Sequence, residues 1–380
     1  MPTDVLFLTQ NLDRGGAQRQ LVTLARGLAR RGYSITVAVF YSRGSLWPEL
    51  ERDGVRVVAL EKRGRWDVAT FLARMGTLVR NERPRVIHGY LDVPNVLALL
   101  LRPVARGARI VWGVRSAYVD WDRFDRLTRL TFSLACRLSR FADLIILNSF
   151  AGREHHRALG YRADRMVVVP NGIDTELFAP DAAARASVRT EWGVGETDIL
   201  IGLVGRIDPL KGHDTFLHAA AAVMRRHPGV RWVCIGGGDA QLLGRLQALG
   251  EQLGVARALR WVGERRDMPA VYNALDVAVS PSISEGFSNV IGEALATGVT
   301  CVATDIGDSA RIVGDVTLVA PVNDVTALTR AIEVALERVG PDSRASRRAR
   351  ILDQFSVSRL VSSTVEALHL PPVGFETTLA

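Results

Sequence analysis

Short apolar runs alternate with longer segments of helical spacing along most of the 380-residue chain. The runs are apolar at successive positions, which is typical of parallel strands buried on both faces. In the first part of the chain, strands are predicted at residues 4–9, 34–40, 55–60, 85–90, 109–114, 143–147 and 165–169. In the second part, they are predicted at residues 198–204, 230–236, 259–262, 276–280, 299–303 and 316–319. The pattern therefore predicts an α/β protein.

The alternation breaks between residues 172 and 197. Pro180, a run of alanines and aspartates, Gly193 and Gly195 occur there together, which is typical of a linker. A chain of this length also exceeds what one hydrophobic core usually serves. We therefore predict two doubly wound Rossmann-like domains, residues 1–181 and a second domain from residue 182, that face each other across a cleft.

Positive charge is concentrated in the first half. Residues 1–182 contain 28 lysines and arginines against 18 aspartates and glutamates, an excess of ten, whereas the remaining residues contain 20 against 22. An anionic membrane surface is therefore a candidate partner of the first domain. The alternative is a solvated basic face in an arginine-rich protein. Basic and aromatic residues are not interleaved as in nucleic-acid readers, so we expect no nucleic-acid partner.

The cellular compartment is inferred from cysteines and apolar runs. Cys136, Cys234 and Cys301 are far apart in apolar segments, which favours reduced core thiols. No run approaches the roughly 18 apolar residues of a membrane-spanning helix, and the N-terminal run resembles a first strand more than a signal peptide. We expect a cytoplasmic protein, soluble or peripheral on the inner face of the membrane.

The stretch from Pro281 to Gly298 is the most informative about function. It leaves an apolar run, passes through small polar residues and re-enters an apolar helical pattern, so it predicts a strand, a loop and a helix N-terminus. Unpaired N–H groups and the positive end of the helix dipole make such a terminus a seat for phosphate. Glu285 precedes this seat and Glu293 follows it by two helical turns. The two carboxylates can hold the sugars that flank a diphosphate, which predicts a nucleotide-sugar site.

Other candidate residues also follow predicted strands. Gly15 and Gly16 lie in the first turn, where they allow a backbone to approach an anion, although turn geometry alone also explains them. The third glycine of the dinucleotide signature is absent, which disfavours nicotinamide binding. Gly236 ends another strand, where a bulky residue would block the cleft. His88 also ends a strand, and its alternative role is that of a core histidine.

Gly205, Arg206 and Lys211 follow the strand at residues 198–204. Two cations five residues apart in one loop can grip a diphosphate. The alternative is a solvated loop that caps a helix. Lys211 is the only lysine in the second half of the chain.

Together these residues resemble a known enzyme family. The Gly15–Gly16 turn, His88, the segment 170–174 with Phe178 and Pro180, Gly205–Arg206 with Lys211–Gly212, and the Glu285/Glu293 pair resemble, in that order, the retaining glycosyltransferases of family 4. The resemblance extends from the first strand to about residue 320 and implies the GT-B fold. In that fold the last helix returns to the first domain, so about 356–380 would join residues 1–181, and residues 182–355 would form the second domain.

The resemblance implies a role for each matching residue. Glu293 would bind the ribose hydroxyls of the donor, and Glu285 the transferred sugar. Arg206 and Lys211 would neutralise the departing diphosphate, and His88 would contact the donor sugar near the reacting centre. The remaining donor-binding residues would be Gly15, Gly16, Gly205, Gly236, Gly286, Phe287, Ser288, Asn289 and Val290.

The resemblance also implies the reaction. A sugar would pass, with its anomeric configuration retained, from a nucleotide-diphosphate-sugar to a saccharide or polyprenyl-linked saccharide in cell-surface polysaccharide or glycolipid synthesis. The donor would be a UDP-sugar rather than a GDP-sugar, and neither a metal nor another cofactor would be required. The leaving phosphate would take the acceptor's proton, so no side-chain base is expected.

The sequence offers two candidate residues for the acceptor site. Arg115 and Tyr118 follow the strand at residues 109–114, where Arg115 can bind an acceptor phosphate. Asp120 and Asp122 match the D-x-D pattern that holds a metal ion in other glycosyltransferases. Because they precede a predicted helix, an N-cap or first-turn role explains Asp122 better.

Two further functions stay open. One is a nucleotide-sugar epimerase or a phosphorylase on the same scaffold, which fold resemblance does not exclude. The other is a carbohydrate-binding or membrane-binding protein with a dead site. The joint presence of Arg206, Lys211, Glu285 and Glu293 disfavours the second, because a binding protein need not keep both leaving-group cations.

Overall fold

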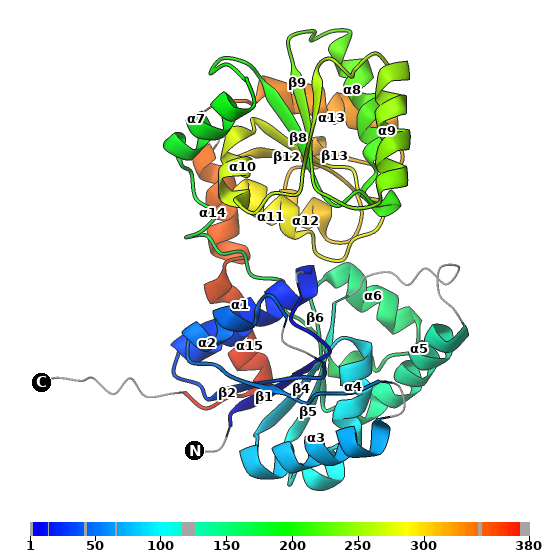
Figure 1. Ribbon diagram of the computed structural model, residues 1–380, viewed down its shortest axis with the longest axis vertical. Coiled ribbons are helices and arrows are strands. Elements are labelled where there is room, and N and C mark those ends of the chain that lie inside the picture. Colours follow the sequence, from blue (N-terminus) through cyan, green and yellow to red (C-terminus); the bar gives the residue numbers. More distant parts are fainter. Residues whose placement is uncertain are drawn as a thin grey trace, which may run out of the picture. The chain divides into compact units, whose positions relative to one another are not determined.

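A computed structural model describes residues 3–13, 15–41, 44–64, 67–115, 126–340 and 344–372, with only the backbone for residues 126–131. The chain divides into two compact units (Figure 1). The first contains Met1–Gly172 and Val357–Ala380, and the second contains Ile173–Ser356. Within the described residues, no helix combines the length and the apolarity needed to span a bilayer.

The first unit is built on a parallel sheet, which has seven strands among the residues described. In spatial order these are β3 (Arg56–Ala59), β2 (Ile35–Val39), β1 (Val5–Thr9), β4 (Val86–Tyr90), β5 (Arg109–Val114), β6 (Leu144–Leu147) and β7 (Met166–Val168). The order reverses between β1 and β4, which is the switch point of a doubly wound sheet.

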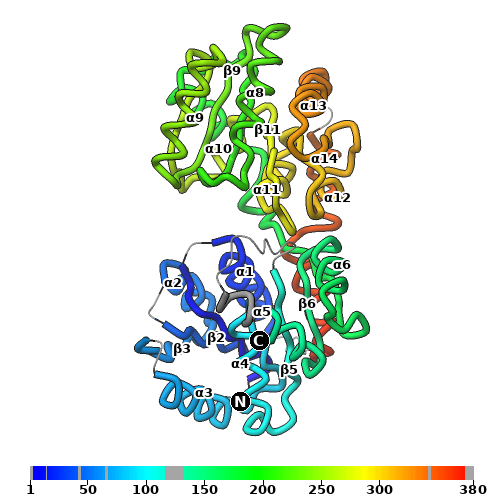
Figure 2. Tube along the Cα trace, turned by 90° about the vertical axis from the view of Figure 1, so that its right-hand side faces the viewer, coloured from blue at the N-terminus to red at the C-terminus, as the bar shows by residue number. Residues whose placement is uncertain are grey.

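Helices cover both faces of this sheet because successive strand residues point to opposite sides. In β1, Val5 and Phe7 face one core and Leu6 and Leu8 face the other. The helices are α1 (Gly16–Arg30), α2 (Trp47–Arg52), α3 (Val68–Glu82), α4 (Asp92–Leu100), α5 (Arg126–Leu138), α6 (Phe150–Ala158) and α15 (Val357–Leu368), with 3₁₀ turns η1 (Arg102–Val104), η3 (Ser139–Phe141) and η4 (Ala163–Arg165). Figure 1 shows α15 beside α1 of the same unit, with which it packs, and Figure 2 follows the Cα trace of the chain after a turn of 90°.

The second unit repeats this architecture with a six-stranded parallel sheet among its described residues. In spatial order its strands are β10 (Leu259–Gly263), β9 (Arg231–Ile235), β8 (Leu200–Val204), β11 (Val277–Ser280), β12 (Thr300–Thr304) and β13 (Val319–Ala320). Its helices are α7 (Ala182–Glu191), α8 (His213–Met224), α9 (Ala240–Gln252), α10 (Met268–Ala274), α11 (Asn289–Ala296), α12 (Ser309–Val313), α13 (Val325–Glu337) and α14 (Arg344–Gln354), with 3₁₀ turns η5 (Pro209–Lys211) and η6 (Val316–Leu318). The switch point lies between β8 and β11. The predicted fold class, two doubly wound α/β sheets, is confirmed.

Two local predictions need correction. The segment 172–197 is not a plain linker, because it contains α7, whose N-cap Asp181 accepts the N–H of Ala184 at 2.9 Å. The strand predicted at 316–319 is mostly the 3₁₀ turn η6, because the Asp315 carboxylate accepts the Thr317 N–H at 2.9 Å and bends the chain there.

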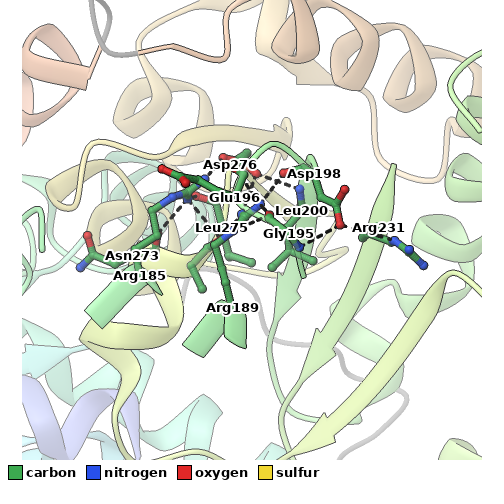
Figure 3. A network of polar contacts seen from close by, with 11 residues as sticks. Arg185, Arg189, Gly195, Glu196, Asp198, Leu200, Arg231, Asn273, Leu275 and Asp276 are labelled. Carbon is green, nitrogen blue, oxygen red and sulfur yellow. Dashed lines mark hydrogen bonds and ion pairs between the residues drawn. The ribbon is translucent and has the colours of Figure 1, made fainter. Parts of the chain in front are cut away.

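A buried ion-pair network ties α7 to the amino edge of the second sheet (Figure 3). Asp276, just before β11, accepts from Arg185 at 2.6 Å and from Arg189 at 3.1 Å, and it also accepts the Leu200 N–H at 2.8 Å. Arg189 is only 3% exposed and also donates to the carbonyls of Ala274 and Gly195. Because every charge in the network is paired and hydrogen-bonded, its burial is tolerated. The network anchors the strands whose opposite ends carry the candidate site.

Candidate functional site

The candidate residues of the second unit lie at the switch point of its sheet. Strands β8 and β11 are neighbours there, and the loops that follow them leave the same carboxyl edge. Arg206 and Lys211 come from the first loop and Glu285 from the second. Ligands of doubly wound sheets bind in the crevice outside such a point, since adjacent loops diverge there.

Lys211 and Glu285 are brought into direct contact. The Lys211 Nζ donates to Glu285 Oε1 at 2.5 Å, and Ser282 Oγ donates to the same oxygen at 3.0 Å. Both charged side chains are partly buried. A cation and a carboxylate held at one edge can serve an anionic group and a hydroxyl of the same ligand.

The two loops are fixed to each other by their backbones. The Ile283 N–H donates to the Leu210 carbonyl at 2.9 Å. Gly212 has φ +66°, and a Cβ at this position would lie 2.1 Å from the Pro281 carbonyl oxygen, so only glycine permits this approach. From β12, the Thr304 hydroxyl donates to the Ser282 carbonyl at 2.5 Å. These contacts hold in place the two loops that carry the Lys211–Glu285 ion pair.

Helix α11 follows the second loop and begins at Asn289. Its N-cap, Ser288, makes no side-chain hydrogen bond to the first turn. Phe287 is buried, and its ring packs edge-on against Phe355 at 5.5 Å between centroids. Anion binding at this N-terminus stays a prediction.

Glu293 lies on the next turn of α11 and is held by a tyrosine. The Tyr272 hydroxyl, on α10, donates to Glu293 Oε2 at 2.8 Å. Burial, followed by the negative charge of Glu293, raises the pKa of Tyr272 well above its ordinary value. Tyr272 therefore stays protonated and keeps one oxygen of Glu293 in place.

Arg206, unlike Lys211 and Glu285, is largely exposed, and the glycines at the strand ends are described with it. The Arg206 side chain is 77% exposed, and its Nη2 donates to Asp208 Oδ2 at 3.4 Å. A Cβ added at Gly205 would lie 3.5 Å from the Lys211 side chain, which is an ordinary contact distance, so packing does not require glycine there. A Cβ at Gly236, where φ is +147°, would lie 1.9 Å from the Gly205 carbonyl oxygen. Close packing of two strand ends thus explains why residue 236 is glycine, and its predicted contact with the donor stays a prediction.

In the first unit, Gly15 and Gly16 lie at the start of α1. Gly15 is the N-cap in an extended conformation and makes no side-chain cap bond, and Gly16 is the first helical residue. Both glycines are exposed. Their predicted contact with the donor stays a prediction.

His88 lies within β4 and is fully buried. Its ring packs on Phe7 at 5.1 Å and on Tyr90 at 5.8 Å between centroids, and neither ring nitrogen has a hydrogen-bond partner in the described part of the chain. Burial, with a smaller effect of the Arg115 charge, lowers the pKa of His88 to about 3. The imidazole is therefore neutral at physiological pH. Its predicted contact with the donor sugar stays a prediction.

Arg115 follows β5 and stacks on Tyr90. Its guanidinium carbon lies 4.5 Å from the centre of the Tyr90 ring, and its Nη1 donates to Asn171 Oδ1 at 3.3 Å. Burial lowers the pKa of Arg115 from its ordinary value. The side chain is thus held at the carboxyl edge of the sheet, where an acceptor phosphate is predicted. Tyr118 lies outside the described residues.

Metal binding was predicted to be unnecessary. Within the described ranges, no three His, Cys, Asp or Glu side chains lie close enough to hold a metal ion. Asp120 and Asp122 lie outside those ranges.

Sequence reasoning missed Ser282 and Tyr90, which lie at the ends of β11 and β4 beside the two switch points, and Tyr272 of α10, which holds Glu293. Ser282 lies inside the stretch identified from sequence, and its position directly after β11 is a usable signal. Tyr90 ends β4, as its position after His88 could have indicated. Tyr272 carries no such signal, because it reaches Glu293 only through the packing of α10 on α11.

Comparison with known proteins matches both halves of the chain to sequence families. Residues 14–177 match a family described as Glycosyltransferase Family 4, and residues 198–338 match one described as Glycosyl transferases group 1. A D-inositol 3-phosphate glycosyltransferase of Corynebacterium urealyticum is 36% identical over 328 residues, covering 78% of this chain and 76% of that protein. A putative glycosyltransferase of Bacillus subtilis, EpsF, is 25% identical over 307 residues, 79% of each chain.

Solved structures share the fold. Anabaena Alr3699/HepE in complex with UDP superposes with a TM-score of 0.85 at 22% identity, covering 97% of this chain and 100% of that one. Sucrose-phosphate synthase from Thermosynechococcus elongatus gives a TM-score of 0.78 at 18% identity, covering 97% and 98%. At these identities the likeness supports the GT-B fold and no more.

Proposed function

The chain belongs to glycosyltransferase family 4, and from this premise we propose that it moves a sugar, with retention of configuration, from a UDP-sugar to a saccharide or lipid-linked saccharide. Synthesis of a cell-surface polysaccharide or glycolipid is the proposed setting. One observation carries the proposal: Lys211 and Glu285 meet at the switch point of the second sheet, directly before the N-terminus of α11.

The proposed roles follow from charge. Breaking the sugar–phosphate bond builds negative charge on the leaving oxygen and positive charge on the anomeric carbon. Lys211, Arg206 and the first-turn N–H groups of α11 would stabilise the leaving diphosphate, because fixed donors lower the barrier most where charge develops. Glu285 would bind hydroxyls of the transferred sugar, and Glu293, steadied by Tyr272, the ribose.

The identity of the donor is supported by a structural neighbour. Anabaena HepE has been solved with UDP, with UDP-glucose, and with UDP and glucose. We therefore propose UDP as the nucleotide of this chain's donor and do not assign the sugar. Thermal melting with a panel of UDP-sugars and GDP-sugars tests this choice, since a ligand at 100 times its Kd adds roughly 2.7 kcal/mol of stability. Stabilisation by GDP-sugars alone would contradict the choice of UDP.

The acceptor is proposed to carry a phosphate. Arg115 is the supporting residue, and curated relatives are named for D-inositol 3-phosphate. The acceptor panel should therefore contain inositol phosphate, polyprenyl diphosphate-linked sugars and free saccharides. In Arg115→Ala we expect a raised acceptor KM for the phosphorylated acceptors alone. Unchanged acceptor KM values would contradict the proposed role of Arg115 in acceptor binding.

Release of UDP with and without acceptor tests the reaction itself. We expect acceptor-dependent release and a product that keeps the donor's anomeric configuration by NMR. Lys211→Ala should lower kcat by about 10²–10³-fold, the usual loss of one such donor. Lys62→Ala, in the first unit, replaces the other lysine of the chain and is the matched control. An epimerised donor without UDP release would favour the epimerase, and donor binding without turnover would favour a binding protein.

A cytoplasmic position at the inner face of the membrane is also proposed. Its support is the excess of ten positive charges within residues 1–182, together with the proposed lipid-linked acceptor. Fractionation of cells into soluble and membrane pools measures it, and a wholly soluble pool insensitive to salt would contradict it.

A further inference from the structure

A pocket of about 350 Å³ lies at the amino edge of the second sheet. It is bordered by the first residues of β8, β9 and β10 and by the turn that follows α7. The candidate donor residues follow the carboxyl ends of β8 and β11, at the opposite edge of this sheet. Small-molecule sites have volumes of about 300–1,000 Å³. The pocket is therefore large enough for a ligand of its own.

The strand register explains why charged and apolar residues meet in this pocket. Leu200 of β8 pairs with Arg231 of β9, and Val233 of β9 pairs with Arg260 of β10. Paired residues of neighbouring strands point to the same face, and so do residues two apart on one strand. All four residues therefore share one face, and all four line the pocket. Because the two aliphatic residues are buried and the two arginines are exposed, the pocket combines an apolar floor with guanidinium groups.

The pocket is positively charged. Arg257, in the loop before β10, lines it together with Arg231 and Arg260, and among the described residues no aspartate or glutamate lines it. Arg231 has a carboxylate partner, Asp198, at 3.9 Å (Figure 3). Within the described ranges, the side chains of Arg257 and Arg260 make neither an ion pair nor a hydrogen bond. Charges of one sign in a concave site attract a counter-ion, so two guanidinium groups are available to an anionic ligand.

Charge at the edge of a sheet has a simpler role to be weighed. A charged side chain on an edge strand prevents pairing with another sheet, and β10 is an edge strand among the strands described. That role accounts for Arg260. It does not account for Arg257, which precedes the strand, or for Arg231, which lies on the inner strand β9. Arginines that converge from two strands and a loop on one apolar floor favour a binding site for an organic anion.

We propose that this pocket binds a small phosphomonoester with a partly apolar body. A phosphate group carries a charge of about −1.5 to −2 at pH 7, which matches the guanidinium groups of Arg257 and Arg260. Guanidinium groups also bind phosphate oxygens in a bidentate manner. The body of the ligand covers the apolar floor formed by Leu200 and Val233. The site goes beyond the transfer reaction, since none of these residues belongs to the proposed donor site.

A titration of the full chain, followed by ligand-observed NMR, tests the proposal. The probes are phenyl phosphate, phenol and inorganic phosphate. We expect phenyl phosphate to bind most tightly, because it alone combines the charge with an apolar ring, and we expect its affinity to fall with salt. The double variant Arg257→Gln/Arg260→Gln should raise the Kd of phenyl phosphate by about tenfold or more, because two charged hydrogen-bond donors are lost. Arg257→Lys/Arg260→Lys keeps the charge without the planar fork, so its Kd should lie between those two values.

Two control variants separate this pocket from other positive charge. Arg245→Gln replaces an exposed arginine of α9 that does not line the pocket, and its Kd for phenyl phosphate should equal that of the wild type. Lys211→Ala removes a cation of the proposed donor site and should also leave this Kd unchanged. Melting temperatures check folding, and they should change little in the arginine variants because the replaced side chains are exposed.

Several results would overturn this assignment. They are a wild type that does not bind phenyl phosphate, inorganic phosphate that binds as tightly as phenyl phosphate, or an Arg257→Gln/Arg260→Gln variant that binds as tightly as Arg245→Gln. Binding that is lost in Lys211→Ala and kept in the arginine double variant would place the probe at the donor site instead. A wild type that releases no UDP would count against the proposed transfer reaction and not against this pocket, because the titration requires no turnover.

Discussion

Replacing Gly292 by alanine should shift α11, the helix that carries the proposed donor-binding residue Glu293. Gly292 precedes Glu293 in α11, and the Ile173 side chain packs directly on it. A Cβ on residue 292 would lie 2.7 Å from both Cγ1 and Cδ1 of Ile173. Ile173 is itself held, since it is buried and its N–H donates to the Phe355 carbonyl at 2.7 Å. The new methyl group must therefore displace either Ile173 or α11.

The size of the effect follows from these distances. Carbon atoms prefer separations of about 3.5–4.0 Å, so α11 and Ile173 must part by about 1 Å. Overpacking of this kind costs about 1–3 kcal/mol, against about 1 kcal/mol that alanine gains over glycine in a helix. The protein should stay folded. A shift of about 1 Å in a positioning helix can nevertheless lower kcat/KM by about 10²-fold.

UDP release at varied donor concentration measures this loss. Ile173→Ala added to Gly292→Ala removes both atoms in conflict and should restore kcat/KM by about tenfold or more. Gly244→Ala in α9 is the matched control, because a Cβ there meets nothing within 4 Å. Wild-type kcat/KM in Gly292→Ala, or no recovery in the double variant, would refute the reasoning.

Three further outcomes are expected. Asp276→Ala leaves the buried Arg189 and the partly buried Arg185 without their carboxylate partner and should cost about 3–5 kcal/mol in urea unfolding followed by tryptophan fluorescence. Glu333→Ala, which removes an ion pair with the exposed Arg226, should cost under about 1 kcal/mol, and equal losses would contradict the role of the network. Burial lowers the pKa of His156 to about 4, so the unfolded chain gains a proton below pH 6.5 that the folded chain does not bind until about pH 4. This group alone should lower the free energy of unfolding by about 1.4 kcal/mol per pH unit through that window, and His88 adds to the fall in the same direction. His156→Gln should therefore make the fall shallower by one group's share, and an unchanged profile would contradict the contribution of His156. Tyr272→Phe removes the hydroxyl that holds Glu293 and should raise the donor KM by about tenfold with kcat nearly unchanged. A lowered kcat with an unchanged donor KM would argue against a role of this pair in ribose binding.

The strand pattern and the strand-end rule located much of the candidate site. Apolar runs placed β8 and β11, and because short loops follow parallel strands, the residues after them had to emerge at one edge. This reasoning found Lys211 and Glu285, which the structure joins at 2.5 Å. It also found the α11 terminus, because the return of helical spacing after Ser288 marks where a helix starts.

Contacts between helices could not be predicted from the sequence. Tyr272 reaches Glu293 only because α10 packs on α11, and neither spacing nor residue type reports that packing. Helix α7 was taken for a linker because Pro180 and the following aspartate signal a break. The same aspartate, Asp181, instead caps the helix, since an N-cap and a loop use the same residue types.

The point where the chain passes from one unit to the other is anchored on both sides. Gly172, in the first unit, is held by Gln20 of α1, whose side chain donates to its carbonyl and accepts its N–H, both at 3.0 Å. Ile173, in the second unit, packs on Gly292 of α11. One peptide bond therefore joins a residue clamped to α1 with a residue clamped to α11, and the N-termini of these helices are the two proposed phosphate seats. Because Ile173 packs directly on α11, a change at residue 173 or 292 acts on the proposed seat of the second unit, which is why the Gly292→Ala and Ile173→Ala pair probes that site directly.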